Sequence, residues 1–110
     1  MNLQPLELTK TLADDLRLRM LVLLAKHGEL CVCDLMNAVD ADQPKVSRHL
    51  AVMKKSDIVT ARREGQWMHY RLHPDLPQWA FVVIRALQDA ASNKAPFTAD
   101  EERIRSMSCC

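Results

Sequence analysis

The chain has 110 residues, ordinary apolar content and a net charge of +1, which fits one folded domain and argues against disorder and indiscriminate nucleic-acid binding. At this size the hydrophobic core is small, so oligomerisation would be a natural source of further stability. No stretch is long and apolar enough to cross a membrane, and Met1 is not followed by a signal-peptide pattern, so we expect a cytoplasmic protein with no membrane partner.

The cysteine content and the charge distribution are more specific. Four cysteines in such a compartment would stay reduced, and they indicate metal or redox chemistry before structural disulfides. Residues 40–73 contain seven basic and four acidic side chains, a net charge of +3, and the remainder carries −2. A local basic face suits a protein that reads DNA sequence as well as phosphate, although an ordinary solvated face would carry the same charge.

Three helices are predicted in the first part of the chain. The first covers residues 5–13. The second begins at a capping residue, Asp14 or Asp15, has apolar residues at helical spacing, and ends before Gly28. The third covers residues 33–39 and buries its apolar side chains at helical spacing.

A fourth helix begins near Gln43, because Asp42 is a good N-cap and Pro44 is tolerated only in the first turn. Its inward face would carry Val46, Leu50 and Met53, and its outward face Lys45, Arg48, His49 and Val52. The third and fourth helices are joined by a short polar turn, residues 40–42. This arrangement predicts a helix-turn-helix motif.

Two strands are predicted at residues 58–63 and 67–72, where apolar and polar residues alternate, and Glu64-Gly65 allows the chain to reverse between them. This hairpin would form the wing beside the helix-turn-helix. The predicted fold class is therefore α+β and mainly helical, a winged helix-turn-helix domain with a two-stranded β-hairpin wing.

Residues 78–91 predict a last long helix with a stripe of apolar residues at helical spacing: Trp79, Val82, Val83, Ala86, Leu87 and Ala90. The stripe could pack on the domain's own core. It is long for a helix that covers so small a domain, so we expect a homodimer formed through the first and last helices. Residues 1–92 would be the DNA-binding and dimerisation domain, and residues 93–110 a flexible or short-helical tail ending in Cys109 and Cys110.

Cys31 and Cys33 are the candidate metal ligands. On a regular helix, residues i and i+2 lie about 200° apart, so the two sulfurs would diverge, whereas on extended backbone they share a face. Chelation of one ion by both sulfurs therefore requires residues 31–33 to be non-helical or the first helical turn to distort. A helix N-terminus also favours the thiolate, the form that binds soft ions.

Four motifs in this order resemble the ArsR family of winged-helix metalloregulators, and most closely its arsenite-responsive repressors. They are ADDLRLR (residues 13–19), ELCVCDL (29–35), QPKVSRHL (43–50) and RREGQW (62–67). The resemblance covers about residues 5–90. It implies a homodimer that needs no cofactor, binds double-stranded operator DNA, and leaves it when As(III) or Sb(III) binds to cysteine thiolates, here Cys31 and Cys33.

The chain departs from that pattern at one position. Many arsenite repressors with this motif have a third cysteine three residues after the second, where this chain has Met36. A thioether is neutral and replaces a thiolate poorly. A third thiolate would come from Cys109, from Cys110 or from a small cellular thiol, or the site would have only two.

The residues expected to contact DNA lie on the fourth helix and at the tip of the wing. On the helix we expect contacts to base edges from Gln43, Ser47 and Arg48, and contacts nearer phosphate from Lys45 and His49. At the wing tip, contacts to phosphate or the minor groove are expected from Arg62 and Arg63.

Alternative functions differ in their ligand or in having none. A cadmium- or lead-sensing repressor of the same family completes its site with N-terminal cysteines, and residues 1–30 contain none. A zinc-sensing site is absent, because residues 78–91 contain no histidine and only Asp89. A winged helix with inert cysteines would bind DNA constitutively. We do not expect an enzyme, because there is no Cys-x-x-Cys and no glycine-rich phosphate loop.

Overall fold

The computed structural model describes residues 1–106 and 109, which form six helices and one three-stranded antiparallel sheet. The helices are α1 (Pro5–Leu12), α2 (Asp15–His27), α3 (Val32–Val39), α4 (Gln43–Lys55), α5 (Gln78–Ala91) and α6 (Phe97–Ser106), and the strands are β1 (Glu29–Cys31), β2 (Val59–Glu64) and β3 (Trp67–Leu72). Within the described residues, no helix combines the length and the hydropathy needed to span a bilayer.

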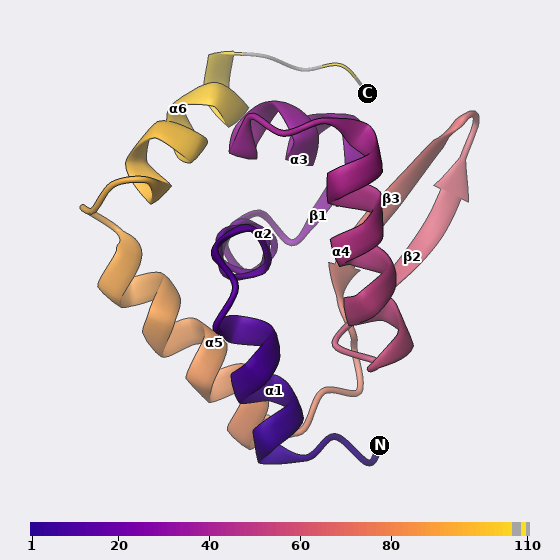
Figure 1. Cartoon of the computed structure of the whole chain (residues 1–110), viewed down its shortest axis with the longest axis vertical. Helices are drawn as coiled ribbons and strands as arrows, with labels where there is room; N and C mark the ends of the chain where they lie inside the picture. Colours follow the sequence, from indigo (N-terminus) through magenta and orange to yellow (C-terminus); the bar gives the residue numbers. More distant parts are fainter. Residues whose placement is uncertain (107–108, 110) are drawn as a thin grey trace.

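Helix α2 lies at the centre of the molecule, and Figure 1 views it end-on with the other elements around it. Residues 20–24 are all buried, more than one face of a helix can account for. An all-round apolar stretch is stable here because α1, α3, α4, α5 and β3 contact α2 from different sides. The helix begins where the Asp14 side chain accepts a hydrogen bond from the Arg17 amide, and it ends at Gly28, whose φ of +84° favours glycine.

Helices α3 and α4 form the predicted helix-turn-helix motif. Asp40 ends α3 in the left-handed conformation, with φ of 54°, and the Asp42 side chain caps α4 by accepting a hydrogen bond from the Lys45 amide at 2.9 Å. The inward face of α4 is buried as predicted, at Val46, Leu50 and Met53. The connection is therefore a tight turn of defined backbone, which makes the position of α4 depend on that of α3.

The wing hairpin is joined by a third strand that was not predicted. β2 and β3 pair as expected, with the reversal at residues 65–66, and β1 pairs with the other edge of β3, so that Cys31 lies opposite His69. The predicted two-stranded wing is confirmed, and β1 extends it to a three-stranded sheet. A strand of three residues between Gly28 and the start of α3 is too short to show an alternating pattern, and only its pairing with β3 makes it a strand.

Helix α5 has the predicted bounds and buries little of itself. Only Ala80, Ile84 and Ala91 are buried, whereas Trp79, Phe81, Val82 and Val83 are exposed, as is Leu6 on α1. Helix α6 follows and packs on α3 and α2 (Figure 1). Part of the segment expected to be a flexible or short-helical tail is thus a helix with a buried residue, Asp100.

Candidate thiol site and nucleic-acid interface

The N-terminal end of α3 holds both candidate ligands. Cys31 ends β1 and is the N-cap of α3, with extended backbone (φ −80°, ψ 160°), and Cys33 lies in the first helical turn. Chelation by both sulfurs would require residues 31–33 to be non-helical or the first turn of α3 to distort. Residue 31 is extended, but residue 33 is helical, so the first turn would still have to distort. The Cys31 side chain is buried and Cys33 is half-buried.

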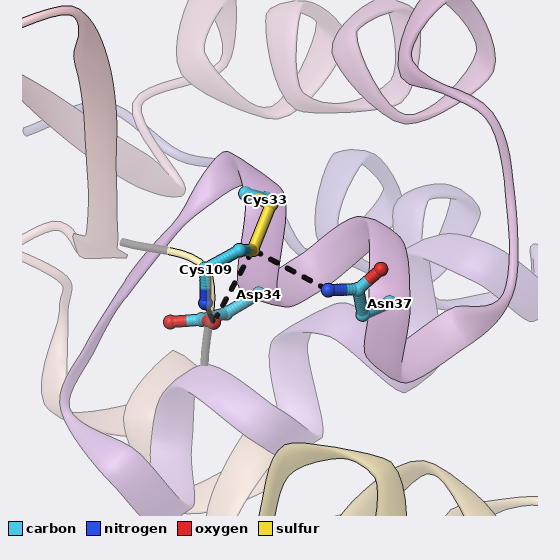
Figure 2. Close-up of a disulfide and its surroundings, with 4 residues drawn as sticks. All are labelled: Cys33, Asp34, Asn37 and Cys109. Atoms are coloured by element: carbon cyan, nitrogen blue, oxygen red, sulfur yellow. Dashed lines mark hydrogen bonds between the residues drawn. A yellow bond between two sulfur atoms is a disulfide. The ribbon is translucent and has the colours of Figure 1, made fainter. Parts of the chain in front are cut away.

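A disulfide joins Cys33 to Cys109, which is 76 residues away in the sequence (Figure 2). The expectation that the cysteines stay reduced is therefore wrong for this pair. The two residues can meet because α6 packs along α3 (Figure 1) and ends three residues before Cys109. Their Cα atoms are 6.0 Å apart, within the ordinary range for a disulfide. Cys110, the other cysteine of the expected pair, lies outside the described residues.

Two polar side chains of α3 surround the Cys109 sulfur. Asn37 Nδ2 donates a hydrogen bond to Cys109 Sγ at 3.3 Å, and the Cys109 amide donates to Asp34 Oδ1 at 3.4 Å (Figure 2). The sulfurs of Cys31 and Cys109 and an Asp34 carboxylate oxygen all lie within 4.8 Å of one another. The sequence analysis singled out neither Asp34 nor Asn37. The available signal was Asn37, which lies four residues after Cys33 and three after Asp34, because residues three to four apart share a helix face.

The C-terminal end of α3 is held by a buried ionic cluster. Asp100 of α6 is fully buried and accepts hydrogen bonds from Arg19 Nε at 2.8 Å, from Arg19 Nη2 at 2.6 Å and from Arg103 Nη2 at 3.0 Å. The two guanidinium groups also donate to α3 carbonyls, Arg103 to Ala38 at 2.8 Å and Arg19 to Val39 at 3.2 Å. The hydrogen bonds to Asp100 raise the pKa of Arg19 above its ordinary value. This cluster links α2, α6 and the last turn of α3.

The predicted DNA-contacting residues on α4 differ in how far they are available. Gln43, Lys45 and Arg48 are exposed, and Ser47 is half-buried. In the described part of the chain, no hydrogen bond or ion pair holds the Arg48 side chain. His49 turns toward α2, where its Nδ1 lies 3.3 Å from Arg17 Nη1 and 3.8 Å from Asp14 Oδ2. Contact of His49 with phosphate stays a prediction, and it would have to be made through Nε2.

On the wing, Arg62 and Arg63 point to different faces because they are successive strand residues. Arg62 Nη2 lies 2.6 Å from Glu29 Oε1, and its Nη1 lies 3.2 Å from Glu64 Oε2. The hydrogen bond between Arg62 and Glu29 raises the pKa of Arg62 and lowers that of Glu29. Arg63 is exposed and makes no ion pair within the described residues. Of the two arginines predicted at the wing tip, Arg63 is therefore the one without an ion pair among the described residues.

Comparison with known proteins gives consistent matches. Residues 14–61 match the model of the bacterial regulatory protein arsR family. The chain is 47% identical over 98 residues to the arsenic resistance transcriptional regulator ArsR1 of Pseudomonas putida, covering 89% of this chain and 75% of that one. It is 51% identical over 82 residues to the arsenical resistance operon repressor of Escherichia coli, covering 74% and 70%. The crystal structure of the AntR antimony-specific transcriptional repressor superposes with a TM-score of 0.65 at 34% identity, covering 81% of this chain and 80% of that one.

Proposed function

The chain belongs to the arsR family of bacterial regulatory proteins, and we propose that it is a metalloid-responsive transcriptional repressor. In this proposal a homodimer binds an inverted-repeat operator in the cytoplasm and is released when As(III) or Sb(III) binds to the thiolates of Cys31 and Cys33. The observation that carries the proposal is the position of these cysteines at the start of α3, the helix that leads directly into α4.

The DNA-binding part of the proposal rests on α4 and the wing. The exposed side chains of Gln43, Lys45 and Arg48 belong to the second helix of the helix-turn-helix, the helix that enters the major groove in such motifs. Arg48 is the best candidate for a base contact, because an arginine can donate two hydrogen bonds to a guanine. Arg63 at the wing would add a phosphate or minor-groove contact.

Dimerisation is supported by the exposed apolar face of α5. Trp79, Val82 and Val83 are 38–56% exposed, and Leu6 of α1 is 64% exposed; a monomer of this size rarely leaves a contiguous apolar face of a helix in water. Val82→Glu would place a charge in the seam, where its desolvation costs several kcal/mol. Sedimentation should then give monomers, whereas Lys94→Glu, just beyond α5, should still give dimers. A dimeric Val82→Glu variant would show that the seam lies elsewhere.

The coupling of ligand to DNA follows from the short path between them. An ion held by both Cys31 and Cys33 must draw together sulfurs that lie on extended and helical backbone, so the start of α3 shifts. The connection between α3 and α4 is only residues 40–42, and it includes the αL residue Asp40 and the cap Asp42. So short a connection cannot change conformation enough to keep α4 in place when α3 shifts. The α4 helices of the two subunits would then lose the spacing that matches the operator half-sites.

The proposal is tested by measuring operator binding with As(III), Sb(III), Cd(II) and Zn(II) side by side, using a DNA fragment selected for tight binding. We expect As(III) and Sb(III) to weaken binding by a factor typical of allosteric ligands, about 5–150, and Cys31→Ser/Cys33→Ser to bind DNA normally and resist release. Release by Cd(II) but not by As(III) would favour a cadmium- or lead-sensing repressor. No response to any ion would mean that the cysteines are inert.

A further inference from the structure

We infer that Cys109 supplies a third thiolate to the inducer site, so that the site is made of Cys31, Cys33 and Cys109 and is completed by the segment that follows α6. This inference rests on the proposed function and adds to it a ligand from outside the helix-turn-helix. It also makes the Cys33–Cys109 disulfide the oxidised, ligand-excluding form of the same site.

The geometry of the three sulfurs carries the inference. Cys109 Sγ is bonded to Cys33 Sγ and lies within 4.8 Å of Cys31 Sγ. Two sulfurs bound to one ion at ~2.3 Å, the length of a zinc–thiolate bond, can be at most about 4.6 Å apart. Once the disulfide is reduced, the Cys109 sulfur therefore needs to move little to share an ion with Cys31 and Cys33. Among the described residues, Cys109 places its sulfur near both cysteines of the α3 end.

The neighbouring groups suit Cys109 as a ligand. Asn37 Nδ2 donates to its sulfur at 3.3 Å, a contact that stabilises a thiolate more than a thiol. Asp34 Oδ1 accepts from the Cys109 amide and lies 3.7 Å from the sulfur, where it can accept the proton of the reduced thiol. Met36, by contrast, is packed against the hydrophobic core and can offer only a neutral thioether.

Helix α6 explains how a residue so far along the chain can be a ligand. The Asp100 cluster fixes α6 against α2 and α3, and α6 ends at Ser106, three residues before Cys109. Because α6 is held in place and ends so close to Cys109 in the sequence, the positions open to Cys109 are limited, which lowers the entropic cost of completing the site. Because Arg103 of α6 also donates a hydrogen bond to the Ala38 carbonyl, movement of Cys109 would reach the residues just before the turn into α4.

The binding reaction balances without a change in the oxidation state of arsenic. Arsenous acid, As(OH)₃, exchanges its three hydroxyl groups for three thiolates; each thiol proton leaves with a hydroxyl group as water. The Cys33–Cys109 disulfide must first take up two electrons and two protons from a thiol or phosphine reductant. In the oxidised protein, Cys33 and Cys109 are therefore not available as thiolates.

The experiment is X-ray absorption of arsenite bound to the full chain, reduced with a phosphine that is removed beforehand. We expect three sulfur neighbours around arsenic in the wild-type protein, two sulfurs and one oxygen in Cys109→Ser, and three sulfurs again in the matched control Cys110→Ser. Protein left oxidised should not bind arsenite until it is reduced.

Two sulfurs in the reduced wild-type protein would overturn the inference, as would loss of a sulfur in Cys110→Ser but not in Cys109→Ser. Either result leaves the proposed function intact, because a pair of thiolates would still bind. Failure of the proposed function has a different signature, namely arsenite that still binds and releases DNA in the Cys31→Ser/Cys33→Ser variant.

Discussion

The two ends of α3 are held by opposite kinds of chemistry. At the N-terminal end, three cysteines meet beside half-buried polar side chains, and the contact with the segment after α6 is made through sulfur. At the C-terminal end, a fully buried carboxylate and two guanidinium groups hold the last carbonyls of the helix. The contacts at the sulfur end can be formed by a ligand or broken by a reductant. The contacts at the ionic end do not respond to a ligand or a reductant, and breaking them near neutral pH is costly because it separates buried charges.

Because of this difference, we expect one end of α3 to control the response to a ligand and the other end to control the stability of the fold. A change at the sulfur end should alter what the protein senses and leave the fold nearly as stable. A change at the ionic end should destabilise the fold before it alters ligand specificity. Since α6 holds the ionic end of α3 and ends three residues before Cys109 at the sulfur end, it is the element through which one end can influence the other.

The largest expected effect is at the ionic end. Asp100→Ala leaves Arg19 and Arg103 without their buried partner, and loss of one member of such a cluster costs about 3–5 kcal/mol of unfolding free energy. Urea denaturation measures this directly. The matched control is Glu102→Gln, exposed on the same helix, which should change stability by less than about 0.5 kcal/mol. Equal stability of the two variants would remove the distinction between the ends of α3.

A smaller effect is expected beyond the turn, on α4. Arg48→Ala should weaken binding to the selected operator by about 1–3 kcal/mol, and weaken binding to random DNA less, because it removes a base contact. The stability of the fold should be unchanged, since Arg48 is exposed. Fluorescence titrations with both DNAs provide the measurement, and Arg105→Ala, exposed on α6, is the control. Equal losses on both DNAs would mean that Arg48 touches only the phosphate backbone.

The smallest expected effect is a pH dependence next to the sulfur end. Arg62 lowers the pKa of Glu29 below the usual 4.5, so their pairing contributes stability above that pH and loses it as the pH falls through the depressed pKa. Thermal unfolding of wild-type protein and Glu29→Gln should therefore differ slightly at neutral pH and converge in acid. Because both side chains are largely exposed, the difference should be small and should shrink with added salt. A gap that widened in acid would contradict this sign.

The sequence was sufficient for those parts of the molecule that local patterns determine. Asp42, Pro44 and the apolar residues of α4 predicted the helix-turn-helix, and the structure confirms it. Alternation in the wing predicted β2 and β3 to within one residue. These features depend on residues close together in the chain, where capping and periodicity leave a readable signal.

The parts that escaped prediction depend on contacts between distant residues. β1 is defined by its pairing with β3. Asp100 can be buried because Arg19, 81 residues earlier in the sequence, donates a hydrogen bond to its carboxylate. The same holds for Cys109, whose place beside Cys33 depends on the path of α6. In the sequence, Asp100 belongs to an ordinary charged helix and Cys109 to a short polar tail. No periodicity indicates that either meets α3.

The most direct test of the coupling between the thiol site and DNA is the affinity of reduced protein for arsenite, measured with and without saturating operator. If metalloid binding weakens DNA binding, linkage requires the operator to weaken metalloid binding by the same factor, about 5–150. We predict that factor for the wild-type protein and for Cys110→Ser. Equal arsenite affinity in free and operator-bound protein would contradict the proposal, because the cysteines could then bind metalloid without any effect on α4.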